Sequence, residues 1–314
     1  MTASQKENVF KPMLAKDGGI APEKYPVALE PKYDGIRALA AVRGIAGKEY
    51  TVSFQSRSGK PFPSRLAKLA EHIAESVNQR FAGGRGMSLP RHGFVLDGEL
   101  VARDGTFGDT QSLVMAKHGG DPSDDLRFMV FDMIPLGMDG SPCPIGSMEP
   151  YALRRREALE RIVPTLCGMK LAPMVIAYNE RMFQDFRTKC RAFGFEGVMS
   201  KDLDATYKPG RSGAWRKHKD ILTLDARVVS FEEGVGKFAG MLGAVMVEGE
   251  YEGRTVRCRV GTGFTDEQRH AFWESRDAMR GQMVEVECQE ITVDGSARFP
   301  VFLRTRECIG AEKA

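Results

Sequence analysis

The first part of the chain alternates short apolar runs with glycine and charged residues. Strand-like runs occupy Val27-Ala28-Leu29, residues 38–42 and residues 50–54, and a glycine-rich turn precedes the last of them. Over residues 64–79, apolar side chains recur at steps of three and four, which predicts an amphipathic helix. This part of the chain is therefore predicted to contain both strands and a helix.

The next segment predicts further strands around a conspicuous acidic tripeptide. Residues 82–93 are rich in glycine and arginine and predict a loop, either a phosphate contact or a plain connector. Two apolar runs, residues 94–96 and 100–102, flank Asp97-Gly98-Glu99 and predict a hairpin-like arrangement. Residues 128–131 predict another buried strand.

Two more helices are predicted in the second half of this part. One covers residues 151–162, with Arg and Glu at its exposed positions. The other covers about residues 179–193 and ends at Gly194, as expected for a glycine C-cap.

The pattern of apolar, glycine and charged residues changes after Lys219. We therefore expect a hinge near residues 220–223 and a domain boundary between residues 221 and 222. Short strands with glycine turns follow, and they are interrupted by one helix-like segment. This pattern predicts a small β-barrel over residues 222–314. The predicted segments are strands at 226–229, 244–247, 283–289 and 299–304 and a helix at 265–279.

Composition describes an ordinary globular protein. The apolar fraction of 42%, the charged fraction of 28% and the length of 314 residues fit two folded domains. No run approaches the roughly 18 apolar residues that cross a bilayer, and the N-terminus lacks an apolar segment like that of a signal peptide. We therefore expect a cytoplasmic location and no membrane partner.

Neither the cysteines nor the histidines indicate a metal site. The six cysteines include no C-x-x-C pair, and the five histidines show no metal-ligand spacing, which argues against a zinc site or a disulfide scaffold. The net charge of +3 divides unevenly, because residues 223–314 carry 12 Lys/Arg against 16 Asp/Glu. The remainder is modestly basic, which suits a phosphate-rich partner, although solvated surface charge would look the same.

The first candidate catalytic residue is Lys32, which lies in Lys32-Tyr33-Asp34-Gly35 beside an apolar strand. A lysine is a nucleophile only when uncharged, and burial or a nearby cation favours that form. By itself the tetrapeptide is more typical of a surface lysine before an Asp-Gly turn.

A second cationic group follows in Trp215-Arg216-Lys217-His218-Lys219. On a strand, residues two apart share a face, so Lys217 and Lys219 can reach one phosphate with Trp215 on the same side. Phosphoryl transfer needs such converging cations to neutralise oxygen charge. The alternative is a basic edge strand that discourages aggregation.

Lys32-Tyr33-Asp34-Gly35 is followed in order by Ser56-Arg57-Ser58-Gly59, Leu96-Asp97-Gly98-Glu99-Leu100, Val130-Phe131-Asp132, Glu196-Gly197-Val198-Met199-Ser200-Lys201 and the Lys217/Lys219 segment. This series closely resembles the covalent nucleotidyltransferases, and within them the ATP-dependent DNA ligases of the compact two-domain bacteriophage T7 type. The resemblance runs from about Phe10 to Arg306. It implies an α+β protein with a nucleotidyltransferase (adenylation) domain of antiparallel sheets flanked by helices at 1–221 and an OB-fold β-barrel at 222–314.

The resemblance also implies a three-step reaction with ATP and Mg²⁺. Lys32 attacks the α-phosphate of ATP to give lysyl-AMP, AMP moves to the 5′-phosphate of a nick, and the 3′-hydroxyl then expels AMP. The expected partner is nicked double-stranded DNA, and we expect a monomer. In this comparison Lys32, Asp34, Lys217 and Lys219 are the catalytic residues.

The same comparison assigns nucleotide contacts and metal ligands. Glu196 is the expected metal ligand, while Glu99 contacts the AMP ribose and approaches a metal. Phe131 stacks on adenine, although a buried core role is its rival, and the Glu30 backbone reads the adenine edge. Arg37 and Arg57 correspond to arginines that contact the nucleotide sugar or the nick phosphate.

The C-terminal arginines are assigned less directly. Glu233-Gly234-Val235-Gly236-Lys237 and residues 298–306 also match phage-type ligases. Arg304 or Arg306 would orient the pyrophosphate, or contact DNA. Many relatives carry Arg-x-Asp-Lys where this chain has Arg306-Glu307-Cys308-Ile309.

The sequence leaves one rival function open and disfavours two others. An RNA ligase or an mRNA-capping guanylyltransferase shares Lys-x-Asp-Gly and the barrel. A non-catalytic OB-fold protein that binds nucleic acid would not need the combination of Lys32, Glu99, Glu196 and the two lysines. An NAD-dependent ligase is disfavoured, because the chain shows neither an extra N-terminal domain nor a four-cysteine zinc module.

Overall fold

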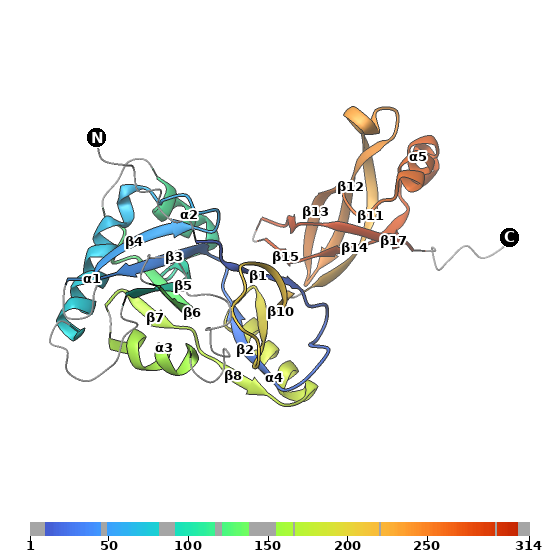
Figure 1. Cartoon of the computed structure of the whole chain (residues 1–314). Coiled ribbons are helices and arrows are strands. Elements are labelled where there is room, and N and C mark those ends of the chain that lie inside the picture. Colours follow the sequence, from blue (N-terminus) through green and yellow to red (C-terminus); the bar gives the residue numbers. More distant parts are fainter. Residues whose placement is uncertain are drawn as a thin grey trace. The chain divides into compact units, whose positions relative to one another are not determined.

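The computed structural model describes residues 10–44, 49–81, 92–116, 121–137, 155–165, 167–219, 221–292 and 294–306. The chain divides into two compact units, Met1–Lys219 and Asp220–Ala314 (Figure 1). This division lies two residues from the boundary that the sequence predicts.

Two five-stranded sheets form the first unit. The first sheet has the order β1 (Met13–Asp17), β10 (Gly210–Lys219), β9 (Gly197–Asp202), β2 (Val27–Lys32) and β8 (Val175–Ala177). The second has the order β4 (Thr51–Ser56), β3 (Ile36–Arg43), β5 (Gly93–Ala102), β6 (Leu126–Pro135) and β7 (Met169–Leu171). Between β2 and β3 the chain passes from one sheet to the other, so Lys32 lies at the last position of β2.

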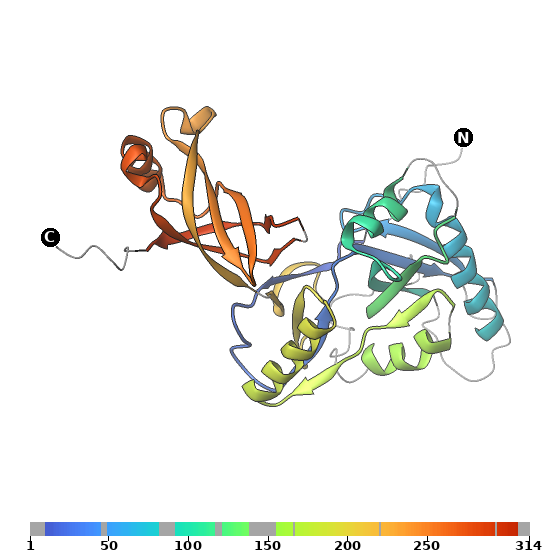
Figure 2. The ribbon, with the colours of Figure 1, turned by 180° about the vertical axis from the view of Figure 1, so that it is seen from behind.

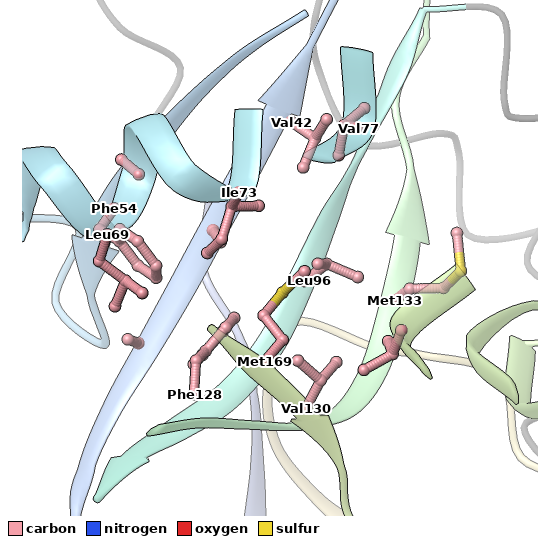
Figure 3. Close-up of a cluster of buried hydrophobic side chains, with 14 of the residues drawn as sticks. Val42, Phe54, Leu69, Ile73, Val77, Leu96, Phe128, Val130, Met133 and Met169 are labelled. Carbon is pink, nitrogen blue, oxygen red and sulfur yellow. The ribbon is translucent and has the colours of Figure 1, made fainter. Parts of the chain in front are cut away.

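Helices cover both sheets of this unit. α1 (Ala67–Phe81) buries Leu69, Ile73 and Val77 against the second sheet, where they meet Val42 and Phe128 (Figure 3). α4 (Glu180–Ala192) packs against β2 and β9 (Figure 2). Its buried residues are Phe183 and Cys190. α2 (Phe107–Met115) and α3 (Arg156–Ile162) complete the set in the described part of the unit.

The predicted helices and most predicted strands of this unit are confirmed. Helix α4 begins after Asn179, whose side chain accepts a hydrogen bond from the Met182 amide, and Gly194 adopts a positive φ of 74° after the helix ends. Residues 82–91 of the predicted loop and residues 151–154 of the predicted helix lie outside the described residues.

The predicted hairpin around Asp97-Gly98-Glu99 is wrong. β5 runs without a turn from Gly93 to Ala102, with a register shift against β6 at Asp97/Gly98. Gly98 is required by packing, since a Cβ there would lie 2.5 Å from the Met129 carbonyl oxygen and 2.6 Å from the Phe128 ring. The glycine therefore marks a close approach between strands.

The second unit is a small barrel. Its sheet has the order β13 (Arg254–Val260), β12 (Leu242–Tyr251), β11 (Leu222–Glu233), β14 (Met283–Cys288) and β17 (Val301–Thr305). A bridge from Thr262 to Val301 brings the end of β13 to β17, the strand at the opposite edge, and thereby closes the sheet. β15 (Glu290–Ile291) pairs with β16 (Ala297–Arg298).

The core of this barrel is formed by inward-facing Val, Leu and Phe side chains such as Leu224, Val247, Val286 and Phe302. The predicted helix at 265–279 is interrupted at Ser275, which separates α5 (Asp266–Glu274) from α6 (Arg276–Met279). None of the helices in the described ranges is long and apolar enough to cross a membrane.

Candidate active site

A cavity of about 260 Å³ lies in the first unit and is lined from both sheets. Eight of the predicted site residues line it: Glu30, Lys32, Arg37, Arg57, Glu99, Phe131, Lys217 and Lys219. Glu196 is not among the lining residues but pairs with Lys32 and Lys219. Asp34 lies in the crossing between β2 and β3 and is not among the lining residues.

Strand register brings the key charges together. Gly197 of β9 pairs with Lys32 on β2 and with Lys219 on β10, so Glu196 at the entry to β9 lies beside both lysines. The Glu196 amide donates to the Lys32 carbonyl at 3.0 Å. A Cβ at position 197 would lie 2.2 Å from the His218 carbonyl oxygen, so this close strand approach requires glycine.

Glu196 forms ion pairs with two lysines at once. Its Oε2 accepts from the Lys32 ammonium and its Oε1 lies 2.8 Å from Lys219 Nζ. Burial acts to raise the pKa of Glu196, but Lys32 and Lys219 outweigh burial and the pKa is lowered. Glu196 is therefore a carboxylate that holds the candidate nucleophile.

Alternation along β10 separates its cationic and buried faces. Trp215, Lys217 and Lys219 line the cavity, whereas His218 faces the other way. His218 Nδ1 lies 3.1 Å from the Gly19 carbonyl oxygen and its Nε2 lies 2.8 Å from Ser200 Oγ. Burial lowers the pKa of His218, so a neutral ring donates to Gly19 and accepts from Ser200. Both contacts fix β10 with its lysines toward the cavity.

Glu99 is a buried carboxyl whose ionised form is energetically unfavourable. Burial raises the pKa of Glu99 to about 7, although Arg37 and Lys32 act in the opposite direction. Glu99 faces Arg37 across the β3–β5 ladder. A ligand that brings positive charge or hydrogen-bond donors would therefore change the protonation of this group.

Arg37 is bound to a buried aspartate. Its Nε and Nη2 donate to the two carboxylate oxygens of Asp97 at 2.6 and 2.7 Å, and Nη2 also reaches the Met13 carbonyl oxygen at 3.1 Å. Burial would lower the pKa of Arg37, but Asp97 outweighs it and the pKa is raised. Arg37 thus keeps its charge at the cavity wall.

Phe131 belongs both to the cavity and to the core. It is 9% exposed and packs edge-on against Trp215, with 6.0 Å between ring centroids. The Arg37 guanidinium and Lys201 Nζ each lie 4.7 Å from the Phe131 ring centroid. Both readings of Phe131 that the sequence allows are compatible with this position.

Lys201 is the main residue that sequence reasoning missed. It is 1% exposed, and its Nζ lies 2.6 Å from Glu30 Oε2 and 3.2 Å from the Phe131 carbonyl oxygen. Burial lowers the pKa of Lys201, which Glu30 and Asp132 partly oppose. Met199 and Lys201 lie two residues apart on β9, and both line the cavity. This two-residue period of a strand is the sequence signal that could have identified Lys201 as a site residue. Tyr33 and Arg211 also line the cavity.

The two C-terminal arginines form ion pairs within the second unit. Arg304 Nε lies 2.5 Å from Glu285 Oε2, and Arg306 Nε lies 2.9 Å from Asp225 Oδ1. Arg306 also approaches Glu285, at 3.3 Å. Both arginines are thus paired with carboxylates of the same unit.

A divalent cation fits this donor set in one way. The described residues hold no group of three or more His, Cys, Asp or Glu that could enclose a metal. Mg²⁺ commonly uses one or two carboxylates and completes its shell with water and phosphate oxygens. Glu99 and Glu196 interact electrostatically and supply that smaller set.

Fold and site together are those of a nucleotidyltransferase domain followed by a small barrel: two sheets, each antiparallel except for one parallel strand pair, enclose a lysine-rich cavity. The model of the ATP-dependent DNA ligase domain matches residues 12–219, and the model of the DNA ligase OB-like domain matches residues 233–306. The chain belongs to the ATP-dependent DNA ligase family. The predicted resemblance and the predicted fold class are thereby confirmed.

Individual relatives agree with this assignment. A probable DNA ligase from Kineococcus radiotolerans is 32% identical over 88% of this chain and 52% of its own length. The solved structure named Pmar-Lig_PreS3 has a TM-score of 0.74 at 27% identity, over 95% of this chain and 68% of that chain. The ATP-dependent DNA ligase from bacteriophage T7, solved with ATP, shares the fold at a TM-score of 0.54 and 19% identity, over 94% and 98% of the two chains.

The chain spans about half the length of the curated relatives it matches first, 52% and 55%. The match of a DNA ligase barrel model to residues 233–306 disfavours the RNA ligase and guanylyltransferase alternative.

Proposed function

We propose that this protein seals 5′-phosphate/3′-hydroxyl nicks in double-stranded DNA, with ATP as the source of AMP. The observation that carries the proposal is the group formed by Lys32, Glu196 and Lys219 in the cavity of an ATP-dependent DNA ligase domain. A nucleophilic amine, a carboxylate that orients it and a cation for the phosphate oxygens thus lie side by side.

Lys32 forms the covalent bond to the nucleotide. Its uncharged amine attacks the α-phosphate, a nitrogen–phosphorus bond forms, and the bond to pyrophosphate breaks. Lys217 and Lys219 share one face of β10, so both ammonium groups stabilise charge on the same phosphate. Asp34, in the crossing that follows Lys32, orients the nucleophile's segment.

The remaining lining residues hold the nucleotide. Phe131 presents a ring for the adenine and the Glu30 backbone reads the base edge, while Glu99 contacts the ribose. Arg37 and Arg57 bind sugar or phosphate, where their planar forks of donors suit oxygen pairs.

Glu196 and Glu99 are the residues that would hold Mg²⁺, and the ion would neutralise charge on the phosphate oxygens when bound. Because Glu196 also binds the Lys32 ammonium, a ligand that takes over this carboxylate frees the amine.

AMP then passes from Lys32 to the 5′-phosphate of the nick, and the 3′-hydroxyl displaces it to join the strands. The sequence also predicts that the protein is a monomer and that it acts in the cytoplasm. Sedimentation of the purified chain with and without nicked DNA tests the first part, and localisation of a tagged chain tests the second.

One assay separates the candidate functions. The purified chain is incubated with Mg²⁺ and α-labelled ATP, GTP or NAD, and then with nicked duplex DNA or RNA. We expect covalent label from ATP alone, and sealed DNA. Label from GTP alone would overturn the assignment in favour of a guanylyltransferase, and sealing restricted to RNA would indicate an RNA ligase.

A further inference from the structure

Four groups close a ring of hydrogen bonds between the two sheets of the first unit. The Met13 amide donates to Tyr207 Oη at 2.8 Å, and Tyr207 Oη donates to Asp97 Oδ2 at 2.7 Å. Arg37 Nη2 donates to the same Asp97 oxygen at 2.7 Å and to the Met13 carbonyl oxygen at 3.1 Å. Met13 lies on β1 of one sheet, whereas Arg37 and Asp97 lie on β3 and β5 of the other.

Three of the four residues in the ring are shielded from solvent, and the side chain of the fourth, Arg37, is 18% exposed. Met13, Asp97 and Tyr207 are each 0% exposed. Burial and the adjacent Asp97 carboxylate raise the pKa of Tyr207, so its hydroxyl remains a donor. A buried carboxylate with both oxygens occupied has one preferred orientation, and so does the arginine that it holds.

The ring reaches the cavity through Arg37. Asp97 and Met13 occupy Nε and Nη2 of its guanidinium, while Nη1 has no hydrogen-bond partner among the described residues. Arg37 lines the cavity, and its guanidinium lies 4.7 Å from the Phe131 ring centroid and 5.6 Å from that of Trp215. The Tyr207 ring packs edge-on against Trp215, with 5.7 Å between ring centroids.

We propose that Tyr207 and Asp97 are positioning residues that direct the Nη1 edge of Arg37 at a phosphate of the nucleotide. The hydroxyl of Tyr207 is the key group, since it ties β1 to the carboxylate that orients Arg37. The inference rests on the proposed function, because the phosphate belongs to the ATP used there.

The test is single-turnover transfer of labelled AMP to the full chain over a range of ATP concentrations. Tyr207→Phe removes one oxygen and keeps the ring that packs on Trp215. We expect its KM for ATP to rise about tenfold, the size expected for one weakened hydrogen bond to a charged group, with full labelling at saturating ATP. Tyr50→Phe is the matched control, because Tyr50 is a buried tyrosine in the core cluster that includes Leu69 and Ile73 of α1, and it does not line the cavity.

A double variant separates positioning from a loss of stability. If Tyr207 acts through Arg37, Tyr207→Phe changes the KM by less than about twofold in an Arg37→Lys background. Additive effects of the two substitutions, or a Tyr207→Phe chain with the KM of the wild type, would overturn the inference. All assays run below the melting temperature of each variant, and Asp97→Asn, with the same expected rise in KM, replaces Tyr207→Phe if that chain does not fold.

Labelling of the wild-type chain distinguishes failure of the proposed function from failure of the positioning role of Tyr207. A wild-type chain that takes no label from ATP removes the proposed function and this inference with it. A wild-type chain that takes label, beside a Tyr207→Phe chain that is indistinguishable from it, removes the inference alone.

Discussion

Lys32 and Glu196 form an ion pair although 164 residues separate them in the sequence. Pairing of β2 with β9 creates this contact, and pairing of β10 with β9 adds Lys219 to the same carboxylate. The candidate nucleophile is therefore bound to a carboxylate that also holds a second lysine. In the proposed function, nucleotide binding has to release the Lys32 amine from Glu196.

Replacement of Lys32 should remove the first chemical step and leave the last one. We expect Lys32→Ala to take no AMP from labelled ATP but to seal a nick that already carries the 5′-adenylate, because sealing needs no lysyl-AMP. Mass spectrometry of the wild type should place the adduct on Lys32. Lys170→Ala, at an exposed lysine of β7, is the control that should label normally. Label on the Lys32→Ala chain would show that another residue is the nucleophile.

Replacement of Glu196 should affect chemistry more than folding. Glu196→Gln keeps the size of the side chain but cannot hold two ammonium groups, so we expect AMP transfer to slow on the order of 100-fold. The side chains of the three partners are 18–25% exposed, so unfolding in urea should change by only about 1 kcal/mol. Glu23→Gln, which breaks an exposed pair with Arg216, is the matched control. Unchanged AMP transfer in Glu196→Gln would remove Glu196 from the site.

The sequence predicts those features that local patterns encode. Steps of three and four residues located α1, and the two-residue period of β10 placed Lys217 and Lys219 together. Strand register is not local, so nothing in the sequence itself shows that Glu196 meets Lys32.

Buried charge is the second feature that local patterns hide. Lys201 has the sequence context of a surface lysine, yet it is 1% exposed and pairs with Glu30. Asp97-Gly98 has the composition of a turn, but the glycine allows a close strand contact and the aspartate is a buried partner of Arg37. In both cases long-range packing decides the role, and residue type alone does not.

Loss of the Lys201 ammonium should destabilise the first unit. Lys201→Met leaves the buried Glu30 carboxylate without its nearest cation, and we expect a loss of about 3 kcal/mol in the free energy of unfolding. The paired variant Lys201→Met/Glu30→Gln removes both charges and should recover part of that loss. Urea unfolding of the single and double variants measures both effects. A double variant less stable than Lys201→Met would contradict a charge-pair role.

Glu99 should make stability depend on pH in the absence of nucleotide and metal. Burial raises the pKa of Glu99 from 4.5 to about 7 in the folded chain, so between these values the unfolded chain has released a proton that the folded chain retains. The unfolded state binds fewer protons there, and the Glu99 contribution to stability is therefore lost as pH rises from 4.5 through about 7. At about 1.4 kcal/mol for each pH unit, the loss amounts to about 3 kcal/mol and is complete above pH 7.

Glu99→Gln should abolish this dependence, because the amide does not ionise and is close in size. At pH 8 we expect the variant to be about 3 kcal/mol more stable than the wild type, and at pH 4 we expect equal stability. Urea unfolding at several pH values gives both curves, and Glu160→Gln, at an exposed carboxylate on α3, controls for surface charge. The same variant should bind ATP less tightly in the AMP-transfer assay, since its carboxylate is a proposed nucleotide contact. The Glu99→Gln curve accounts for the other carboxyls. If the difference in unfolding free energy between the wild type and this variant is the same at pH 5 and at pH 8, Glu99 ionises normally.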